Sequence, residues 1–237
     1  MIRLVTLDLY ATLCYSVPSR NERLARLMCE LGYPCRAEDF LRANVLAEEL
    51  YTCENGRVAL HTRTEDEQEA FYAGMFGLML REAGLRHDPD FALQVRRALV
   101  ANRDDVSYRL YDDVVPTLEA LRERGLSLGV VSNTARDVTP LCTELGVCDR
   151  VDFVVSSCLV GCEKPGRLIF ETALGHVGVE PCEALHVGDQ PRSDALGAQA
   201  MGMHALLLDR DHLLSHEEYE RIHSLMEVPG WLDRRRS

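Results

Sequence analysis

The segment Ile2–Asp8, with the sequence IRLVTLD, is a short and mainly apolar run that ends in one carboxylate. A run of this length, rich in β-branched and apolar residues, is typical of a buried strand. In open α/β sheets the reactive groups lie just beyond the carboxyl ends of the strands. Asp8 therefore stands where such a sheet places its chemistry, and a carboxylate there can act as a nucleophile in covalent catalysis.

The composition is typical of a soluble globular protein. The chain has 237 residues, of which 46% are hydrophobic and 27% are charged, and its formal net charge is −12. This length suffices for one large α/β domain or for a core with a smaller insert. The acidic balance argues against a nucleic-acid or membrane partner, while a local lysine or a bound cation still allows a small anionic substrate in one cleft.

Membrane spans and metal clusters of cysteine are not expected. The chain has no apolar run long enough for a span and no signal-peptide pattern at its start, which predicts a cytoplasmic protein. The 9 cysteines are scattered and include no CxxC pair, so zinc binding is not indicated. We expect them to act as small hydrophobic residues.

The periodicity of residues 16–108 is helical throughout. Apolar residues recur every three or four positions in four segments, which are 22–31, 40–50, 69–80 and 91–99. The segments are separated by Asn55-Gly56, Gly84 and Asp88-Pro89. Four helices with no strand between them predict a small bundle inserted into another domain.

From residue 109 onward the pattern alternates between strands and helices. The expected strands are 126–131, 153–155, 184–187 and 204–208. The expected helices are 115–124, 134–145, 168–177 and 195–201. Repeated strand–helix units predict the α/β class with a parallel, doubly wound sheet.

Polar residues with complementary chemistry follow several of these strands. They are Asp8, the pair Ser132-Asn133, Lys164, and Asp189 with Asp194. A hydroxyl and an amide can hydrogen-bond an anion, and a lysine can neutralise the charge that develops during attack. Crowded carboxylates repel one another unless a cation joins them, and their hard oxygen atoms suit Mg²⁺. Together these residues predict a site for a small anionic substrate and a magnesium ion.

The same residues lie in four ordered motifs that resemble those of the haloacid dehalogenase superfamily. The motifs are Leu7–Leu13 (LDLYATL), Val130–Asn133 (VVSN), Glu163–Phe170 (EKPGRLIF) and Val187–Asp194 (VGDQPRSD). The resemblance covers nearly the whole chain. It implies a Rossmann-like core of residues 1–14 and 109–237, a helical cap domain of residues 15–108, and an aspartyl-phosphate or aspartyl-ester intermediate on Asp8.

The resemblance also implies a role for each catalytic and substrate-binding residue. Asp8 is expected to be the nucleophile and Thr12 to orient it. Ser132 is expected to bind the substrate anion, with Asn133 positioning the loop. Lys164 is expected to neutralise charge and to face the substrate.

One Mg²⁺ ion is implied as the cofactor. Its expected ligands are Asp8, the main-chain carbonyl of Tyr10, and Asp189, with Asp194 as an outer or alternative ligand. Asp194 is equally suited to a helix cap.

Tyr10 departs from the phosphatase pattern. Phosphatases of this superfamily usually carry an acid two residues after the nucleophile, which protonates the leaving alcohol and later activates water. Such help is worth roughly 10²–10⁴ in rate, and a phenol with a pKa of about 10 replaces it poorly. The 2-haloacid dehalogenases of the superfamily carry a tyrosine there, because halide leaves without a proton. Tyr10 therefore favours a dehalogenase.

Asp189 and Asp194 favour the opposite interpretation. Dehalogenases use no metal and replace the metal-binding acid with a neutral residue, and no arginine here clearly matches the one they use for the substrate carboxylate. Three clustered carboxylates without a cation would be costly and would repel an anionic haloacid. The prediction is a Mg-dependent phosphatase of a small phosphorylated metabolite. A metal-free 2-haloacid dehalogenase and a catalytically impaired binding protein are the alternatives.

Some of these residues also suit simpler structural roles. His186 lies on an apolar strand, and we expect a core histidine with satisfied hydrogen bonds rather than a ligand. Ser132 and Asn133 are also suited to capping the helix that is expected after them. The substrate and the oligomeric state are left open by the sequence.

Overall fold

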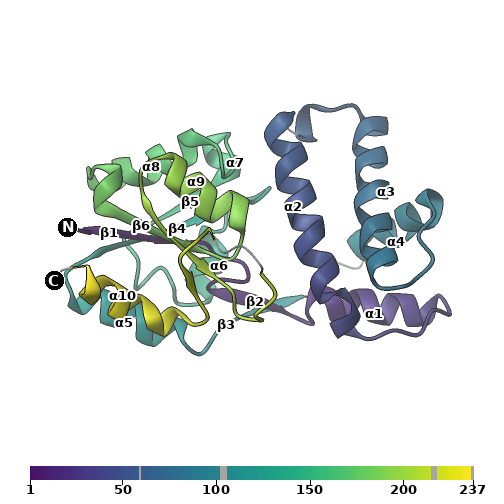
Figure 1. Cartoon of the computed structure of the whole chain (residues 1–237), viewed down its shortest axis with the longest axis horizontal. Coiled ribbons are helices and arrows are strands. Elements are labelled where there is room, and N and C mark those ends of the chain that lie inside the picture. The colour runs from purple at the N-terminus through teal and green to yellow at the C-terminus, as the bar shows by residue number, and fades with distance from the viewer. Residues whose placement is uncertain (59, 102–105, 215–217, 236–237) are drawn as a thin grey trace. The chain divides into compact units, whose positions relative to one another are not determined.

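The computed structural model describes residues 1–58, 60–101, 106–214 and 218–235. The chain divides into two compact units (Figure 1). The first unit consists of Met1–Tyr15 and Tyr108–Ser237, and the second consists of Ser16–Ser107. The second unit is thus inserted into the sequence of the first, directly after the first motif.

The first unit is built on a six-stranded sheet with the order β5-β4-β1-β6-β7-β8. Its strands are β1 (Leu4–Leu7), β4 (Ser127–Ser132), β5 (Phe153–Ser156), β6 (Ala184–Gly188), β7 (His204–Leu208) and β8 (Arg221–Ile222). Every neighbouring pair in this sheet is parallel. The predicted α/β class with a parallel, doubly wound sheet is confirmed, and β1 lies inside the sheet between β4 and β6.

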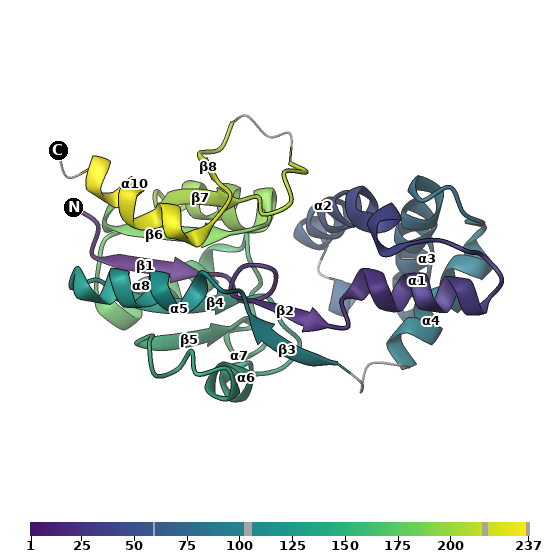
Figure 2. The ribbon, with the colours of Figure 1, turned by 90° about the horizontal axis from the view of Figure 1, so that it is seen from below.

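Helices cover both faces of this sheet (Figure 2). They are α5 (Val114–Glu123), α6 (Thr139–Glu144), α7 (Ser157–Val160), α8 (Arg167–Val177), α9 (Gly197–Ala200) and α10 (Val228–Arg234). Three helical segments are not α-helical: the 3₁₀ turns η3 (Pro181–Glu183) and η5 (Leu225–Glu227), and the π-helical η4 (Pro191–Leu196).

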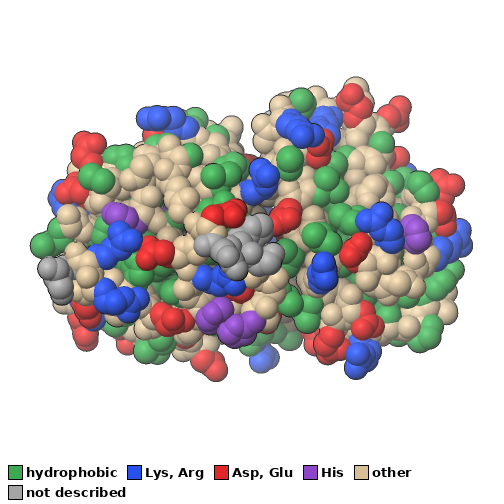
Figure 3. All heavy atoms as spheres, in the orientation of Figure 1, with side chains coloured by type: hydrophobic (Ala, Val, Ile, Leu, Met, Phe, Trp, Pro, Cys, Tyr) green, Lys and Arg blue, Asp and Glu red, His purple; other side chains and the backbone are tan. Residues whose placement is uncertain are grey.

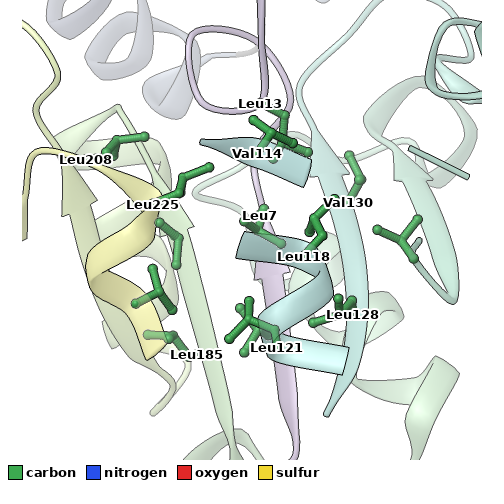
Figure 4. Close-up of a cluster of buried hydrophobic side chains, with 14 of the residues drawn as sticks. Leu7, Leu13, Val114, Leu118, Leu121, Leu128, Val130, Leu185, Leu208 and Leu225 are labelled. Carbon is green, nitrogen blue, oxygen red and sulfur yellow. The ribbon is translucent and has the colours of Figure 1, made fainter. Parts of the chain in front are cut away.

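Alternating side chains of the strands enter two separate cores. Leu7 packs with Leu118 and Leu121 of α5 on one face, where Leu225 also contributes (Figure 4). Leu4 packs on the other face with Phe170 of α8. Side chains two residues apart on a strand share a face, so Thr6 belongs to the same face as Leu4.

The second unit is a bundle of four helices. They are α1 (Arg20–Glu30), α2 (Leu41–Arg57), α3 (Glu65–Glu82) and α4 (Pro89–Ala101), with short turns η1 (Ala37–Phe40) and η2 (Leu60–Thr62). Capping boxes start two of the helices, Ser19 with Glu22 at α1 and Thr64 with Glu67 at α3. The predicted break at Asn55-Gly56 is wrong, because α2 continues through both residues to Arg57.

Other boundaries differ from the sequence-based expectations. The chain enters and leaves the second unit through strands β2 (Cys14–Val17) and β3 (Ser107–Leu110), which pair with each other, so the helical pattern does not extend over all of residues 16–108. The helix expected from residue 134 begins only at Thr139. The N–H groups of Thr134 and Val138 instead donate hydrogen bonds to Ser157 Oγ and Ser156 Oγ, at 2.9 and 3.1 Å, which stabilises an extended loop.

The surface mixes charges of both signs. On the face shown in Figure 3, arginine side chains are interspersed with Asp and Glu, and no broad basic area forms there. Among the residues that the structure describes, every helix is too short or too polar to cross a bilayer.

Candidate active site

Asp8 follows the central strand β1 directly and begins a tight loop. Its N–H donates to the carbonyl of Val187 at 2.9 Å, which continues the pairing of β1 with β6. The loop closes where the N–H groups of Leu13 and Cys14 both donate to the carbonyl of Leu9, at 2.8 and 2.9 Å. Asp8 is only 8% exposed, so its carboxylate needs a partner inside the protein.

That partner is Lys164, the only lysine in the chain. Lys164 is 3% exposed. Its Nζ donates to Oδ1 of Asp8, to Oδ1 of Asp194 at 2.7 Å, and to the carbonyl of Val131 at 2.8 Å. An ammonium has three N–H donors, so all of them are used. Burial alone would lower the pKa of Lys164, but the charges of Asp194 and Asp8 raise it above its usual range, and the side chain is charged.

Asn133 fixes the main chain that carries Lys164. Its Oδ1 accepts from the N–H of Lys164 at 2.7 Å, and its Nδ2 donates to the carbonyl of Lys164 at 2.8 Å. The suggested role of Asn133 as a helix cap is wrong, since the next helix starts at Thr139 and its N-terminal flanking residue is Val138. The amide instead joins the loop after β4 to the loop after α7.

Ser132 carries a buried hydroxyl without a partner. It is the last residue of β4, the strand beside β1, and it is 0% exposed. Among the described residues nothing hydrogen-bonds its Oγ. Leaving a buried polar group unsatisfied costs about 1–3 kcal/mol, so such groups are rare in native structures. An orphaned donor at this strand end is suited to an acceptor that arrives from outside, such as an oxygen of an anionic substrate.

Asp194 lies on the buried side of the site, in η4. Its Oδ1 accepts from Lys164 and lies 3.0 Å from Nε2 of His186, and its Oδ2 accepts from the N–H of Gln190 at 2.9 Å. Gly188 leaves room for this carboxylate, because a Cβ at that position would overlap it. Burial alone would raise the pKa of Asp194, but the charge of Lys164 and the bond from His186 hold it well below its usual range.

Asp189 is half-buried and makes fewer hydrogen bonds than Asp194 in the part of the chain that the structure describes. Oγ1 of Thr12 donates to its Oδ1 at 3.3 Å. Thr12 was expected to orient Asp8, and the hydrogen bond that the structure gives its hydroxyl goes to Asp189 instead. Burial, followed by the charges of Asp8 and Asp194, raises the pKa of Asp189 well above its usual range.

The carboxylates of the site outnumber the positive charge that neutralises them. Asp8, Asp189 and Asp194 share the single ammonium of Lys164, and no other cationic side chain in the described residues donates to them. Burial raises the pKa of Asp8 to about 6 despite that ammonium. An excess of hard, negatively charged oxygen atoms in a partly buried site fits a divalent cation such as Mg²⁺.

The side chains free to hold such an ion are Asp8 and Asp189. Both oxygens of Asp194 are already occupied by Lys164, His186 and Gln190, so its expected ligand role stays a prediction without direct support. The described residues contain no group of three His, Cys, Asp or Glu side chains arranged for a metal ion. Main-chain, solvent or substrate oxygens would therefore have to complete the coordination.

Tyr10 is half-buried and packs against Tyr108, with 5.4 Å between the ring centroids. Burial, with smaller contributions from Tyr108 and Cys14, raises the pKa of its phenol to about 12. The phenol is therefore a weaker acid than a free tyrosine, and its hydroxyl stays protonated throughout the physiological range.

Sequence reasoning missed one residue that supports the site. Arg210 donates to the carbonyl of Thr12 at 2.8 Å and forms a two-pronged pair with Asp113, at 2.9 Å for each bond. It thereby holds the loop that carries Asp8 and Thr12. No local pattern links Arg210 to that loop, because the two are far apart in the chain and an arginine after a strand is common.

Comparison with known proteins identifies the family to which this site belongs. The model of the haloacid dehalogenase-like hydrolase family matches residues 2–202. A curated relative from Mus musculus, named haloacid dehalogenase-like hydrolase domain-containing protein 3, is 43% identical over 102 residues, which cover 43% of this chain and 41% of that protein. A glyceraldehyde 3-phosphate phosphatase from Methanopyrus kandleri is 40% identical over 131 residues, which cover 54% of this chain and 55% of that protein.

The alignments with these curated relatives thus span about half of each relative's length or less. A solved structure named as a 2-haloacid dehalogenase from Pseudomonas syringae is 27% identical and superposes with a TM-score of 0.58, and the match covers 99% of both chains. The fold is therefore shared with proteins named for either of the two chemistries that the sequence left open.

In the absence of divalent cations, we expect the free energy of unfolding to decrease as the pH rises from about 4 through about 6. The pKa of Asp8 is about 6 in the folded protein and about 4 in an unfolded chain, so the folded state binds the proton more tightly. Protonation in this window therefore stabilises the fold, and deprotonation leaves an uncompensated buried charge. Added Mg²⁺ should reverse the loss near pH 7.

Thermal melting with a chelator at about pH 5 and about pH 7, and with Mg²⁺ at the higher pH, measures this dependence. Asp8→Asn is the matched control, since it removes the titrating group and should flatten the pH slope. A wild type whose stability falls no more steeply than that of the variant through this window, with no response to Mg²⁺, would contradict the charge imbalance at the site.

Proposed function

This chain belongs to the haloacid dehalogenase-like hydrolases, and we propose that it is a Mg²⁺-dependent phosphatase of a small phosphorylated metabolite. The surplus of carboxylate over positive charge around Asp8 carries this proposal. Asp8, Asp189 and Asp194 share one ammonium that already makes three hydrogen bonds. A metal-free reaction with an anionic substrate would add further negative charge to that cluster.

The chemistry proposed for Asp8 is nucleophilic attack on phosphorus. Lys164 donates one hydrogen bond to Oδ1 of Asp8, so this oxygen keeps a further lone pair. Oδ2 would form a bond with the phosphorus atom while the bond from phosphorus to the leaving oxygen breaks. Water then hydrolyses the acyl phosphate, releases inorganic phosphate and regenerates the carboxylate of Asp8. Asp8, Asp189 and the main-chain carbonyl of Tyr10 would hold Mg²⁺. When bound, the ion would neutralise charge on the phosphoryl oxygens.

The other site residues are proposed to bind and orient. The unpartnered hydroxyl of Ser132 would donate to a phosphoryl oxygen, because the protein itself leaves this buried donor unsatisfied. Asn133 would keep Lys164 in place through its two hydrogen bonds. Asp194 would hold the ammonium of Lys164 rather than the metal, since both of its oxygens have donors.

Tyr10 restricts the substrates that such a site can hydrolyse quickly. The raised pKa of about 12 makes its phenol a poor proton donor to a departing alkoxide. Leaving groups that are weak bases, such as those of acyl and aryl phosphates, need no proton. We therefore infer a preference for phosphoryl groups on stable leaving groups, or a slow reaction with ordinary alkyl phosphates.

A metal-free 2-haloacid dehalogenase is the second candidate, and Tyr10 is the observation that favours it. The 27% identity to a protein named as a 2-haloacid dehalogenase supports the same alternative. The half-buried Asp189 argues against it, because a carboxyl group there has no use in a metal-free site.

We expect the purified protein to hydrolyse p-nitrophenyl phosphate with Mg²⁺ and to lose this activity with a chelator. Asp8→Asn should abolish turnover, because an amide oxygen is a poor nucleophile. Release of nitrophenolate measures the first reaction, and release of chloride from 2-chloropropionate in chelator measures the second candidate. Chelator-resistant chloride release would replace the proposal with a dehalogenase, and failure of both assays would favour a binding protein.

We also expect Tyr10→Asp to increase turnover of alkyl phosphates by roughly 10-fold or more, because it supplies the missing proton donor. Turnover of p-nitrophenyl phosphate should change much less, since nitrophenolate leaves without a proton. Tyr10→Phe is the matched control, which removes the hydroxyl and keeps the ring against Tyr108. Equal changes for the two substrates in Tyr10→Asp would count against the role assigned to this position.

A further inference from the structure

His186 is buried in the sheet directly beneath the proposed catalytic residues. It lies in the middle of β6 and is 1% exposed. Its register partner on β1 is Thr6, whose Oγ1 lies 2.8 Å from Nδ1 of the ring. On the other side of the ring, Nε2 lies 3.0 Å from Oδ1 of Asp194. A chain of contacts therefore runs from Thr6 through His186 and Asp194 to Lys164 and Asp8.

The donors and acceptors of this chain can be assigned. Oδ1 of Asp194 is ionised and can only accept, so Nε2 of His186 carries a proton and donates it. Burial lowers the pKa of His186, which favours a neutral ring with a lone pair on Nδ1. The hydroxyl of Thr6 then donates to Nδ1. A neighbouring hydrogen bond that fixes the tautomer in this way also fixes the orientation of the ring.

His186 ties Asp194 to the interior of the sheet. Among the described residues, the other donors to this carboxylate are Gln190, in the same turn of chain, and Lys164 itself. Lys164 cannot compensate for a shift of Asp194, because its three donors are already used. A displacement of Asp194 would therefore be passed on to the ammonium and to its bond with Asp8.

We propose that His186, fixed in one tautomer by Thr6, is a positioning residue that sets the geometry of the Asp194–Lys164–Asp8 chain. This inference rests on the proposed function. The ring touches neither the substrate nor the reacting oxygen, and it acts on the reaction only through Asp194.

His186→Phe is the substitution that removes the donor with the least change in packing. The ring packs edge-on against Phe170, with centroids 5.3 Å apart, and a phenyl ring keeps that contact. The hydroxyl of Thr6 keeps an acceptor too, because the carbonyl of Leu185 lies 3.4 Å away. The main loss is the hydrogen bond to Asp194.

We expect His186→Phe to lower kcat by roughly 10-fold, as is typical when a residue that orients a functional side chain is removed. KM should stay within about twofold, because substrate binding is not touched. His186→Gln should recover most of kcat, since its amide offers one donor and one acceptor in place of the two ring nitrogens. His204→Gln, on the adjacent strand β7, is the control histidine.

A second measurement needs no turnover. Because Lys164 is the only lysine, labelling with ¹⁵N- and ¹³C-lysine gives one side-chain signal, that of the ammonium in the site. We expect this signal to shift in His186→Phe, to return toward the wild-type position in His186→Gln, and to stay unchanged in His204→Gln. ¹⁵N-histidine spectra of the wild type should also show a neutral ring protonated at Nε2.

The outcomes separate this inference from the proposed function. If the wild type hydrolyses no phosphate ester, the proposed function fails, while the lysine and histidine signals still test the chain of contacts. An unchanged kcat and an unchanged lysine signal in a folded His186→Phe protein would overturn the inference. So would a ring protonated at Nδ1 only. If His186→Phe does not fold, the wild-type histidine spectrum decides.

Discussion

One buried ammonium connects the parts of the site. Nζ of Lys164 bonds Asp8 after β1, the carbonyl of Val131 in β4, and Asp194 after β6, so it joins three neighbouring strands of the sheet at their carboxyl ends. All other members of the Lys and Arg class in the chain are arginines. A compact ammonium with three donors satisfies three acceptors in different directions, whereas the planar fork of a guanidinium does not. The single lysine therefore lies at the position where three acceptors in different directions require an ammonium group.

The same contact explains why the site has an unbalanced charge. Lys164 compensates for Asp194 and part of Asp8, and Asp189 is left with the hydroxyl of Thr12. Burying carboxylates without a full set of cations costs free energy, and the raised pKa values of Asp8 and Asp189 express that cost. We propose that a divalent cation and an anionic substrate complete this site. The unpartnered hydroxyl of Ser132 is the group that we propose to bind the substrate.

The sequence predicted the parts of this arrangement that depend on local pattern. Asp8, Ser132 and Asp189 each lie at or directly after the end of a strand, and the strand pattern places such residues at one edge of a parallel sheet. Contacts between segments that are distant in the sequence could not be predicted from it. No periodic pattern of residues in the sequence indicates the hydrogen bonds of Asn133 to the Lys164 main chain or of Arg210 to Thr12. Helix α6 begins only at Thr139 because the hydroxyls of Ser156 and Ser157, in another segment, accept hydrogen bonds from the loop before it. Local helix propensity does not include such contacts.

Asp189 is the residue whose charge we propose is left for a divalent cation. Titration calorimetry of the chelator-treated protein with Mg²⁺, compared with an Asp189→Ala variant, tests this most directly. We predict that the wild type takes up one ion per chain and that the variant takes up none, because the variant loses one of the two side chains that remain free to bind it. A wild type that takes up no Mg²⁺, or a variant that binds it equally well, would contradict the electrostatic basis of the proposed site.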